Sequence, residues 1–350
     1  MKRASLYPAL ALLLLFAAHT HGFAQYPRVV LFEEFTNLTC KPCTTATPIL
    51  NALEIAHANH IAMIRFHPNL PLSGDPFYNA NKPQNDARQT YYGVSALPHG
   101  RADGISSVVV TQEGEVQDKV NERLAMESPV KVDVTQSREG NKVNVSVDVT
   151  AGPNDGLSGD YRLRVVAVEA HIHDASYVGN PRYNGESDFY DVMRTMVPDP
   201  DGTTVTLNAG EKKSFQMSYD LQSGWQPDQI YTIAFVQNED SKEVVQAGST
   251  PRPVAGITSI PVMRGYSLAQ SAPNPAGDAA AISYVIAGPE HVAVTLYDAA
   301  GLLVRQSDLG LVEPGEHSTT LDLRGLPSGM YTYTLRAGAF IASRTMTVVH

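Results

Sequence analysis

The feature that most constrains this chain is its cysteine content: its 350 residues include only two cysteines, three positions apart, in Cys40-Lys41-Pro42-Cys43. A disulfide framework that stabilises a small fold closes long loops, and a bond between these two residues closes almost none. The pair therefore adds little stability through chain entropy, and this points to chemistry. Two alternatives stay open. The pair is a passive disulfide on an inherited scaffold, or it is half of a zinc site, which the lack of a second cysteine pair disfavours.

The residues around the pair predict a strand, a helix and a second strand. Arg28 to Phe35 and Ile61 to Phe66 are apolar runs of strand length, and apolar residues repeat at helical spacing up to about Asn59. The pair thus falls where a helix begins, and a thiolate there faces unpaired backbone N–H groups and the positive end of the helix dipole. These lower its pKa, so we expect Cys40 to be the nucleophile and Cys43 the resolving thiol.

Three further features near the pair resemble the thioredoxin family. The run CKPCTTATPIL is similar to its active-site helix, residues 92–98 (YGVSALP) are similar to the run that ends in its cis-proline, and Glu34 stands where it has a buried acid. The resemblance covers residues 28–127 and implies that Pro98 shapes an edge that pairs with a substrate peptide. It also implies that Glu34 assists proton transfer at Cys43, unless Glu34 is a buried acid paired elsewhere.

The sequence also departs from thioredoxin. Thr39 replaces the tryptophan before the first cysteine, and Lys41 replaces a glycine between the cysteines. A positive charge there favours the thiolate, which predicts a more oxidising couple. The run LFEEFTNLTCKPC, with residues 191–194 (DVMR) and 233–237 (IAFVQ), is similar to a narrower group, the outer membrane protein 28-related surface proteins of Bacteroidetes-type bacteria. Those proteins pair a thioredoxin-like domain with a β-domain.

Three histidines invite a functional interpretation. His171 and His173 fall on one face of a predicted strand, where we expect ordinary sheet histidines rather than metal ligands. His99 follows Pro98 and in the thioredoxin fold would lie near the thiols, which makes it a candidate for tuning Cys40. We expect no metal, and no cofactor beyond a redox-active disulfide.

The remaining patterns predict a multidomain chain, α/β followed by all-β. Residues 1–24 have a basic start, a short apolar core and small residues before the end, which predicts a signal peptide. Period-two alternation begins near Val130 and predicts a β-sandwich. The predicted organisation is a signal peptide (1–24), a thioredoxin-like domain (25–128), a β-sandwich domain (129–252), a linker (253–264) and a C-terminal β-sandwich (265–350).

The C-terminal segment carries three short motifs in a fixed order. They are APNP at 272–275, LYDAAG at 296–301 and LPSGMY at 326–331. Their order and place resemble the type IX secretion sorting domain, an immunoglobulin-like β-sandwich. The resemblance implies that type IX secretion machinery recognises residues 265–350 and that the protein travels through the periplasm to the outer membrane surface or beyond. A plain adhesive immunoglobulin-like domain is the alternative.

Composition excludes several classes of partner. The formal net charge is -10 and no basic run exists, which disfavours nucleic acid and anionic lipid as ligands. After the signal peptide no stretch is apolar enough to predict a transmembrane span.

Two functions remain open on the sequence alone. One is an exported thiol–disulfide oxidoreductase that uses Cys40, Cys43, Pro98 and Glu34. The other is a non-catalytic surface binding protein with a structural disulfide, whose binding surfaces are the polar segments 67–92 and 174–202. Exposure of the Cys40 sulfur separates them, because an exposed thiol beside a cis-proline favours chemistry and a thiol capped by segment 67–92 favours structure.

Overall fold

The structure, a computed structural model, describes residues 26–57, 60–253, 266–298, 303–337 and 340–350. The predicted signal peptide, residues 1–24, and all but the first residue of the predicted linker lie outside these ranges. The described chain is mostly β, with several sheets and four α-helices among the described residues. A β-rich, multidomain fold is therefore confirmed.

The largest sheet has nine strands, and it runs through both of the first two predicted domains. Its order is β14-β13-β9-β10-β3-β2-β4-β5, with β11 alongside β9. The strands are β2 (Val30–Phe35), β3 (Ile61–Phe66), β4 (His99–Ala102), β5 (Ser106–Val108), β9 (Leu157–His173), β10 (Asp188–Val197), β11 (Thr203–Leu207), β13 (Ile230–Asn238) and β14 (Val244–Ser249).

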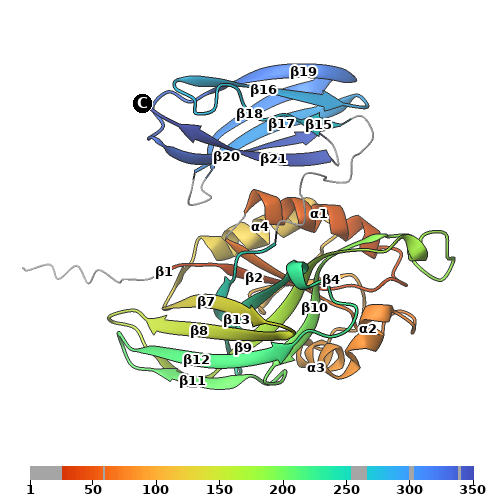
Figure 1. Cartoon of the computed structure of the whole chain (residues 1–350), viewed down its shortest axis with the longest axis vertical. Helices are drawn as coiled ribbons and strands as arrows, with labels where there is room; N and C mark the ends of the chain where they lie inside the picture. The colour runs from red at the N-terminus through yellow and green to blue at the C-terminus, as the bar shows by residue number, and fades with distance from the viewer. Residues whose placement is uncertain (1–25, 58–59, 254–265, 299–302, 338–339) are drawn as a thin grey trace, which may run out of the picture.

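Helices cover both faces of the N-terminal part of this sheet. Helices α1 (Cys43–Ala56) and α4 (Glu113–Leu124) lie on one face (Figure 1). Helix α3 (Lys82–Tyr92) packs on the other face through Tyr92, and the short α2 (Pro76–Ala80) precedes it in the chain. Val30 and Phe32 of β2 pack with α1 and α4, whereas Leu31 and Phe35 pack in a second cluster that includes Tyr92 of α3. Every residue of β2 and β3 is therefore buried, which explains why both predicted strands are apolar runs.

The sequence predicted a domain boundary at residues 128–129, but the sheet continues across it. Val192 of β10 stands beside Arg65 of β3 in a parallel pairing. Because β3 is buried along its whole length, its free edge needs a hydrogen-bonding partner, and β10 supplies it. Periodicity predicts each strand but not which strand lies beside it, so no pattern in the sequence indicated this shared sheet.

A second sheet completes the middle region. It has the order β12-β8-β7, formed by β7 (Val130–Glu139), β8 (Lys142–Ala151) and β12 (Lys212–Asp220). Inward-facing valines of β7 and β8 share one core with β9, β11 and β13. Burial alternates residue by residue along β8, as the period-two pattern predicted. The short elements of this part are β1 (Tyr26–Pro27), β6 (Glu127–Ser128), η1 (Ala175–Tyr177) and η2 (Pro227–Gln229).

The C-terminal unit has its own core between two sheets of three and four strands, β15-β16-β19 and β18-β17-β20-β21. The strands are β15 (Ser267–Leu268), β16 (Ala279–Ile286), β17 (Glu290–Tyr297), β18 (Leu303–Val312), β19 (Gly315–Asp322), β20 (Gly329–Ala337) and β21 (Phe340–Val348). This unit lies beyond α1 and α4 (Figure 1). Arg336 of β20 forms an ion pair with Glu113 of α4.

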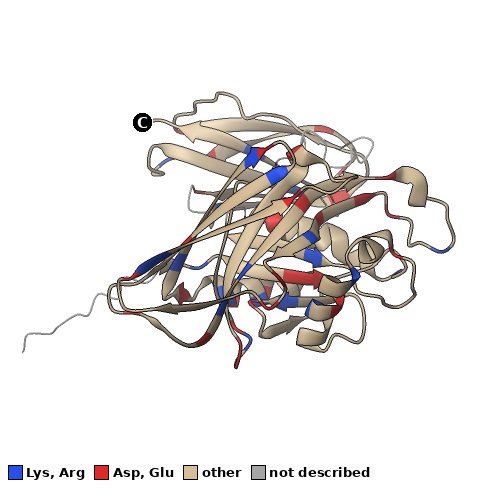
Figure 2. Cartoon of the chain, turned by 60° about the horizontal axis from the view of Figure 1, so that its bottom comes forward, with Lys and Arg blue, Asp and Glu red and all other residues tan. Residues whose placement is uncertain are grey.

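The sequence disfavoured nucleic acid and anionic lipid as ligands and predicted no transmembrane span, and two observations concern these expectations. In the cartoon of Figure 2, acidic and basic positions are interspersed along the ribbon of the described chain. Within the described ranges, no helix has both the length and the apolar character needed to cross a bilayer.

Candidate functional site

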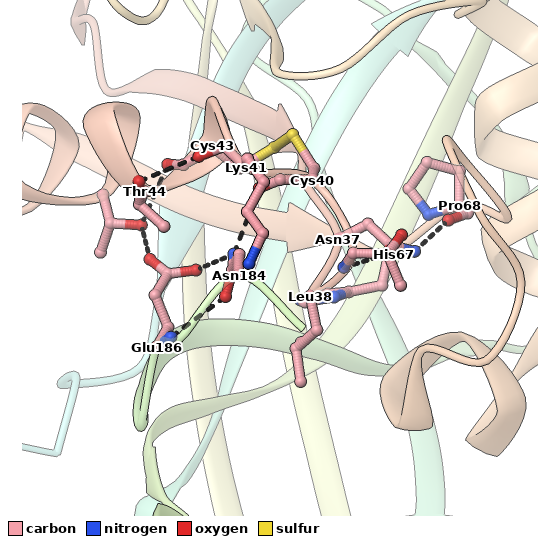
Figure 3. The surroundings of a disulfide bond; sticks show 12 residues. Asn37, Leu38, Cys40, Lys41, Cys43, Thr44, His67, Pro68, Asn184 and Glu186 are labelled. Carbon is pink, nitrogen blue, oxygen red and sulfur yellow. Dashed lines mark hydrogen bonds between the residues drawn. A yellow bond between two sulfur atoms is a disulfide. The ribbon is translucent and has the colours of Figure 1, made fainter. Parts of the chain in front are cut away.

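The two cysteines form a disulfide at the N-terminus of α1 (Figure 3). Cys43 is the first residue of the helix and Pro42 is its N-cap, with no side-chain cap and no acidic residue in the first turn. The predicted place of the pair, after a strand and at a helix start, is confirmed. The first three backbone N–H groups of α1 donate to the carbonyls of Cys40, Lys41 and Pro42, at 3.3, 3.4 and 3.1 Å. The positive end of the helix dipole is therefore what would favour a thiolate if the bond were reduced.

Both cysteines are buried beneath neighbouring segments. Cys40 is 1% exposed and Cys43 is 0% exposed, whereas Lys41 and Pro42 between them are exposed. Attack on a disulfide requires a thiolate to approach one sulfur along the S–S bond. In this conformation the sulfurs therefore offer no path to a protein substrate.

The first covering segment is the cover loop, residues 174–187, which joins β9 to β10. Asn184 donates its backbone N–H to the Leu38 carbonyl at 2.6 Å and its side-chain amide to the Cys40 carbonyl at 3.3 Å. The Lys41 ammonium donates to the Tyr183 carbonyl, and Thr47 Oγ1 donates to Glu186 Oε1 at 2.5 Å. Asn184 and Glu186 lie beside Lys41 and the disulfide in Figure 3. Four contacts thus tie the loop to the residues around the disulfide.

The second covering segment belongs to residues 67–92. Asp75, the N-cap of α2, accepts the Leu38 backbone N–H at 2.8 Å, and the Leu72 carbonyl accepts from Thr39 Oγ1 at 3.2 Å. The two segments also touch each other, since Arg182 donates to the Ser73 carbonyl. The two loops that the sequence suggested as separate binding surfaces therefore meet over the disulfide.

Glu34 lies on the same face of β2 as Val30 and Phe32, beneath α1, and is 1% exposed. Arg65 on the adjacent strand places Nε 2.9 Å from Glu34 Oε2, but the angle is not that of a hydrogen bond, and neither carboxylate oxygen has a hydrogen-bond partner in the described chain. Burial raises the pKa of Glu34 to about 7, and the nearby Arg65 charge only partly opposes it. Glu34 is thus a buried acid that binds or releases a proton near neutral pH.

Pro98 and His99 stand at the start of β4. The Leu97–Pro98 peptide bond is cis, as predicted. His99 lies opposite Phe35 in the antiparallel β2–β4 pairing, its ring 6.1 Å from that of Phe35, and Arg101 donates to its Nε2 at 3.2 Å. Phe35 belongs to the core on the face opposite α1, so His99 points away from the helix that carries the cysteines. The structure thus gives His99 partners other than Cys40.

His171 and His173 both contact one carboxylate. Asp188 Oδ1 lies 2.9 Å from His171 Nε2 and 2.9 Å from His173 Nδ1. Over the ranges that the structure describes, no group of three or more His, Cys, Asp or Glu residues is arranged to hold a metal ion.

A pocket lined by residues that include Thr47, Arg65 and Glu186 has a volume of about 10 Å³, the space of one water.

Asn184 and Glu186 are the site residues that sequence reasoning missed. Asn184 contacts Cys40 across 144 positions, and Glu186 contacts Thr47 across 139. Their segment shows only polar, loop-like composition, and nothing in that composition names a partner so distant in sequence.

Solved structures of bacterial proteins resemble this chain to different degrees. HBP35 of Porphyromonas gingivalis has a TM-score of 0.53 at 12% identity, over 93% of this chain and 99% of that one. Protein AGR_C_4864 from Agrobacterium tumefaciens has a TM-score of 0.44 at 14% identity, over 65% of this chain and 95% of that one. A domain of the outer membrane lipoprotein Omp28 from Porphyromonas gingivalis has a TM-score of 0.26 at 16% identity, over 35% and 87%. At such identities the first likeness shows the fold alone, and no curated protein matches.

Two family models match the chain. The model described as outer membrane protein Omp28 matches residues 85–250, and the model described as secretion system C-terminal sorting domain matches residues 272–348. The first match crosses the predicted boundary at 128–129, in keeping with the shared sheet, and it leaves out Cys40 and Cys43. Both matches support a location at the outer membrane surface or outside the cell. The chain therefore carries an Omp28-family domain of the outer membrane proteins, followed by the type IX C-terminal sorting domain that its last motifs predicted.

Proposed function

We propose that this chain is an exported surface binding protein with a thioredoxin-like N-terminal scaffold, in which the disulfide braces two contact loops. One observation carries the proposal: Cys40 is 1% and Cys43 0% exposed beneath the cover loop and the Leu72 segment. A disulfide used for exchange needs an accessible sulfur. A disulfide used as a brace needs only to fix the backbone around it. Here both loops form hydrogen bonds with that backbone.

The order of the N-terminal elements supports a thioredoxin-like scaffold. Strands β2 and β3 are parallel and joined through α1, and β4 pairs antiparallel with β2. The cysteines precede α1, Pro48 lies inside that helix, and the cis Pro98 comes directly before β4. A crossover through a helix is the usual way to join parallel strands.

Two exposed apolar side chains support a binding role for the loops. Leu72 is 58% exposed and Val178 of the cover loop is 55% exposed. Loops held by a rigid scaffold are common sites of recognition, and apolar side chains at their tips supply contact area. By the same proposal the C-terminal unit is an immunoglobulin-like sandwich that type IX secretion machinery recognises.

Thiol–disulfide exchange is the second candidate, and two observations favour it. The pair lies at a helix N-terminus without an acidic residue in the first turn, and Glu34 beneath that helix has a pKa raised by burial to about 7. Cys40 as nucleophile, Cys43 as resolving thiol, Glu34 as proton carrier and Pro98 as the substrate edge stay proposals. All of them require the cover loop to move away from Cys40.

The deciding experiment is the reduction potential of the Cys40–Cys43 couple. The protein without residues 1–24 is equilibrated in glutathione and dithiothreitol buffers, and insulin reduction is measured in parallel. We expect the bond to stay closed below the range of exchange enzymes, roughly -270 to -120 mV, with no insulin turnover. A potential inside that range, with turnover that disappears in Cys40→Ala, would replace the binding protein with an oxidoreductase.

A further inference from the structure

The cover loop also suggests a device that neither family match describes. We propose that residues 174–187 form a lid that shields the Cys40–Cys43 disulfide, latched by Asn184 and Glu186 to the disulfide segment, and that release of this latch opens the disulfide to thiols. The inference rests on the proposed function in one respect, the thioredoxin-like scaffold beneath the lid.

The latch is concentrated in four consecutive residues of the cover loop. Tyr183 offers its carbonyl to Lys41, Asn184 bonds to Leu38 and Cys40, and Glu186 accepts from Thr47. Lys41 lies between the two cysteines and Thr47 lies in the first turns of α1. The loop therefore forms hydrogen bonds with residues before, between and after the two cysteines.

Asn184 and Glu186 also hold each other in the latched shape. Asn184 Nδ2 donates to Glu186 Oε2 at 2.6 Å, and the Glu186 backbone N–H donates to Asn184 Oδ1 at 3.1 Å. Gly185 between them has a φ of 100°, a conformation that L side chains rarely adopt. This tight turn aims both side chains at the disulfide segment (Figure 3).

The rest of the cover loop is anchored away from the cysteines. The Tyr177 ring lies 5.8 Å from that of Phe189, which lies 5.0 Å from that of Phe77 of α2. At the base of the loop, the Asp174 N–H donates to the Ser187 carbonyl at 2.8 Å. Tyr183 joins the two sets of contacts, because its ring lies 5.2 Å from that of Tyr177. Asn184 and Glu186 take no part in these anchoring contacts, so the base of the loop stays in place when their bonds to the disulfide segment break. The hydrogen bonds of the latch are polar and partly exposed, and such contacts open more readily than a packed core.

The test measures access to the disulfide with dithiothreitol as the probe. One thiolate of the probe attacks a cysteine sulfur, the S–S bond breaks and a mixed disulfide forms. The second thiolate then closes the cyclic disulfide of the probe, so that two electrons and two protons pass to Cys40 and Cys43. Free thiols are alkylated at successive times and counted by mass spectrometry, in buffer without denaturant.

We expect Asn184→Ala to be reduced roughly tenfold or more faster than the wild type, because each net hydrogen bond lost raises the open population by about that order. Thr47→Val, which removes one contact while keeping the Asn184–Glu186 pair, is expected to give a smaller acceleration. Asn154→Ala, at an exposed asparagine outside the cover loop, is the matched control and should follow the wild type.

Two results would overturn the lid. One is equal reduction rates for Asn184→Ala, Thr47→Val, the control and the wild type. The other is acceleration accompanied by an equivalent fall in the free energy of unfolding, since reduction would then proceed through the unfolded chain. Failure of the proposed function is distinguishable, because it appears as insulin turnover by the wild-type protein whatever the latch variants do.

Discussion

Neighbouring glutamates on the two faces of β2 have opposite surroundings. Glu33 faces α3, where Arg88 donates to both of its oxygens at 2.6 and 3.0 Å and the Tyr92 hydroxyl donates at 2.6 Å. Glu34 lies on the face covered by α1, where Arg65 Nε is 2.9 Å from its Oε2 without the alignment of a hydrogen bond. Both are fully buried, at 0% and 1% exposure, so hydrogen bonding and not depth separates them.

This difference separates a structural region from a region capable of chemistry. A buried carboxylate with all its partners fixes the packing around it, and Glu33 links β2 to α3 and, through Arg88 and Gln237, to β13. A buried carboxylate without aligned donors holds its charge poorly, and its pKa rises toward the pH at which proteins work. The satisfied acid therefore fixes the packing of the core, whereas the unsatisfied acid can take up a proton near neutral pH, as its proposed role requires.

The largest effect is expected when Glu33, the acid with all its hydrogen-bond partners, is removed. We expect Glu33→Ala to cost about 3–5 kcal/mol of unfolding free energy, because it leaves the Arg88 guanidinium buried without a counter-charge. Urea denaturation followed by circular dichroism measures this. The double variant Glu33→Leu/Arg88→Met is the control and should recover most of the loss. A cost below 1 kcal/mol for Glu33→Ala would contradict the structural role.

The unsatisfied acid, Glu34, predicts that the free energy of unfolding depends on pH. The pKa of Glu34 rises from 4.5 unfolded to about 7 folded, so the folded state binds the extra proton and stability falls as pH rises from 4.5 to 7. The full loss is about 3 kcal/mol. Glu34→Gln should remove this slope and exceed the wild type in stability at pH 8. Unfolding free energies of both proteins between pH 4 and 9 test it, and identical slopes would refute the raised pKa.

The smallest expected effect concerns the disulfide as a brace. Replacement of Cys40 and Cys43 together by alanine should cost about 2 kcal/mol of unfolding free energy, because the bond closes a very short loop. Its local effect should be clearer: amide hydrogen exchange at Asn184 should speed up while exchange in β9 stays slow. Unchanged protection at Asn184 in the double variant would mean that the bond does not brace the cover loop.

The sequence by itself determined the features that depend on short-range patterns. The apolar runs of β2 and β3, the start of α1 at the cysteine pair and the alternation along β8 all follow from residues close together in the chain. The C-terminal motifs likewise identified the sorting domain, because turn residues and strand ends are local. Local geometry and periodicity leave a direct mark on a sequence.

Only the tertiary structure decided what lies beside these elements. It joined β10 to β3 across a predicted domain boundary, turned His99 away from the cysteine helix and placed Asn184 on Cys40 from 144 positions away. It also separated the roles of Glu33 and Glu34, which are adjacent identical residues in the sequence. Partner choice at such distances depends on which buried edges and charges remain to be satisfied once the core has packed, and that requirement has no period in the sequence.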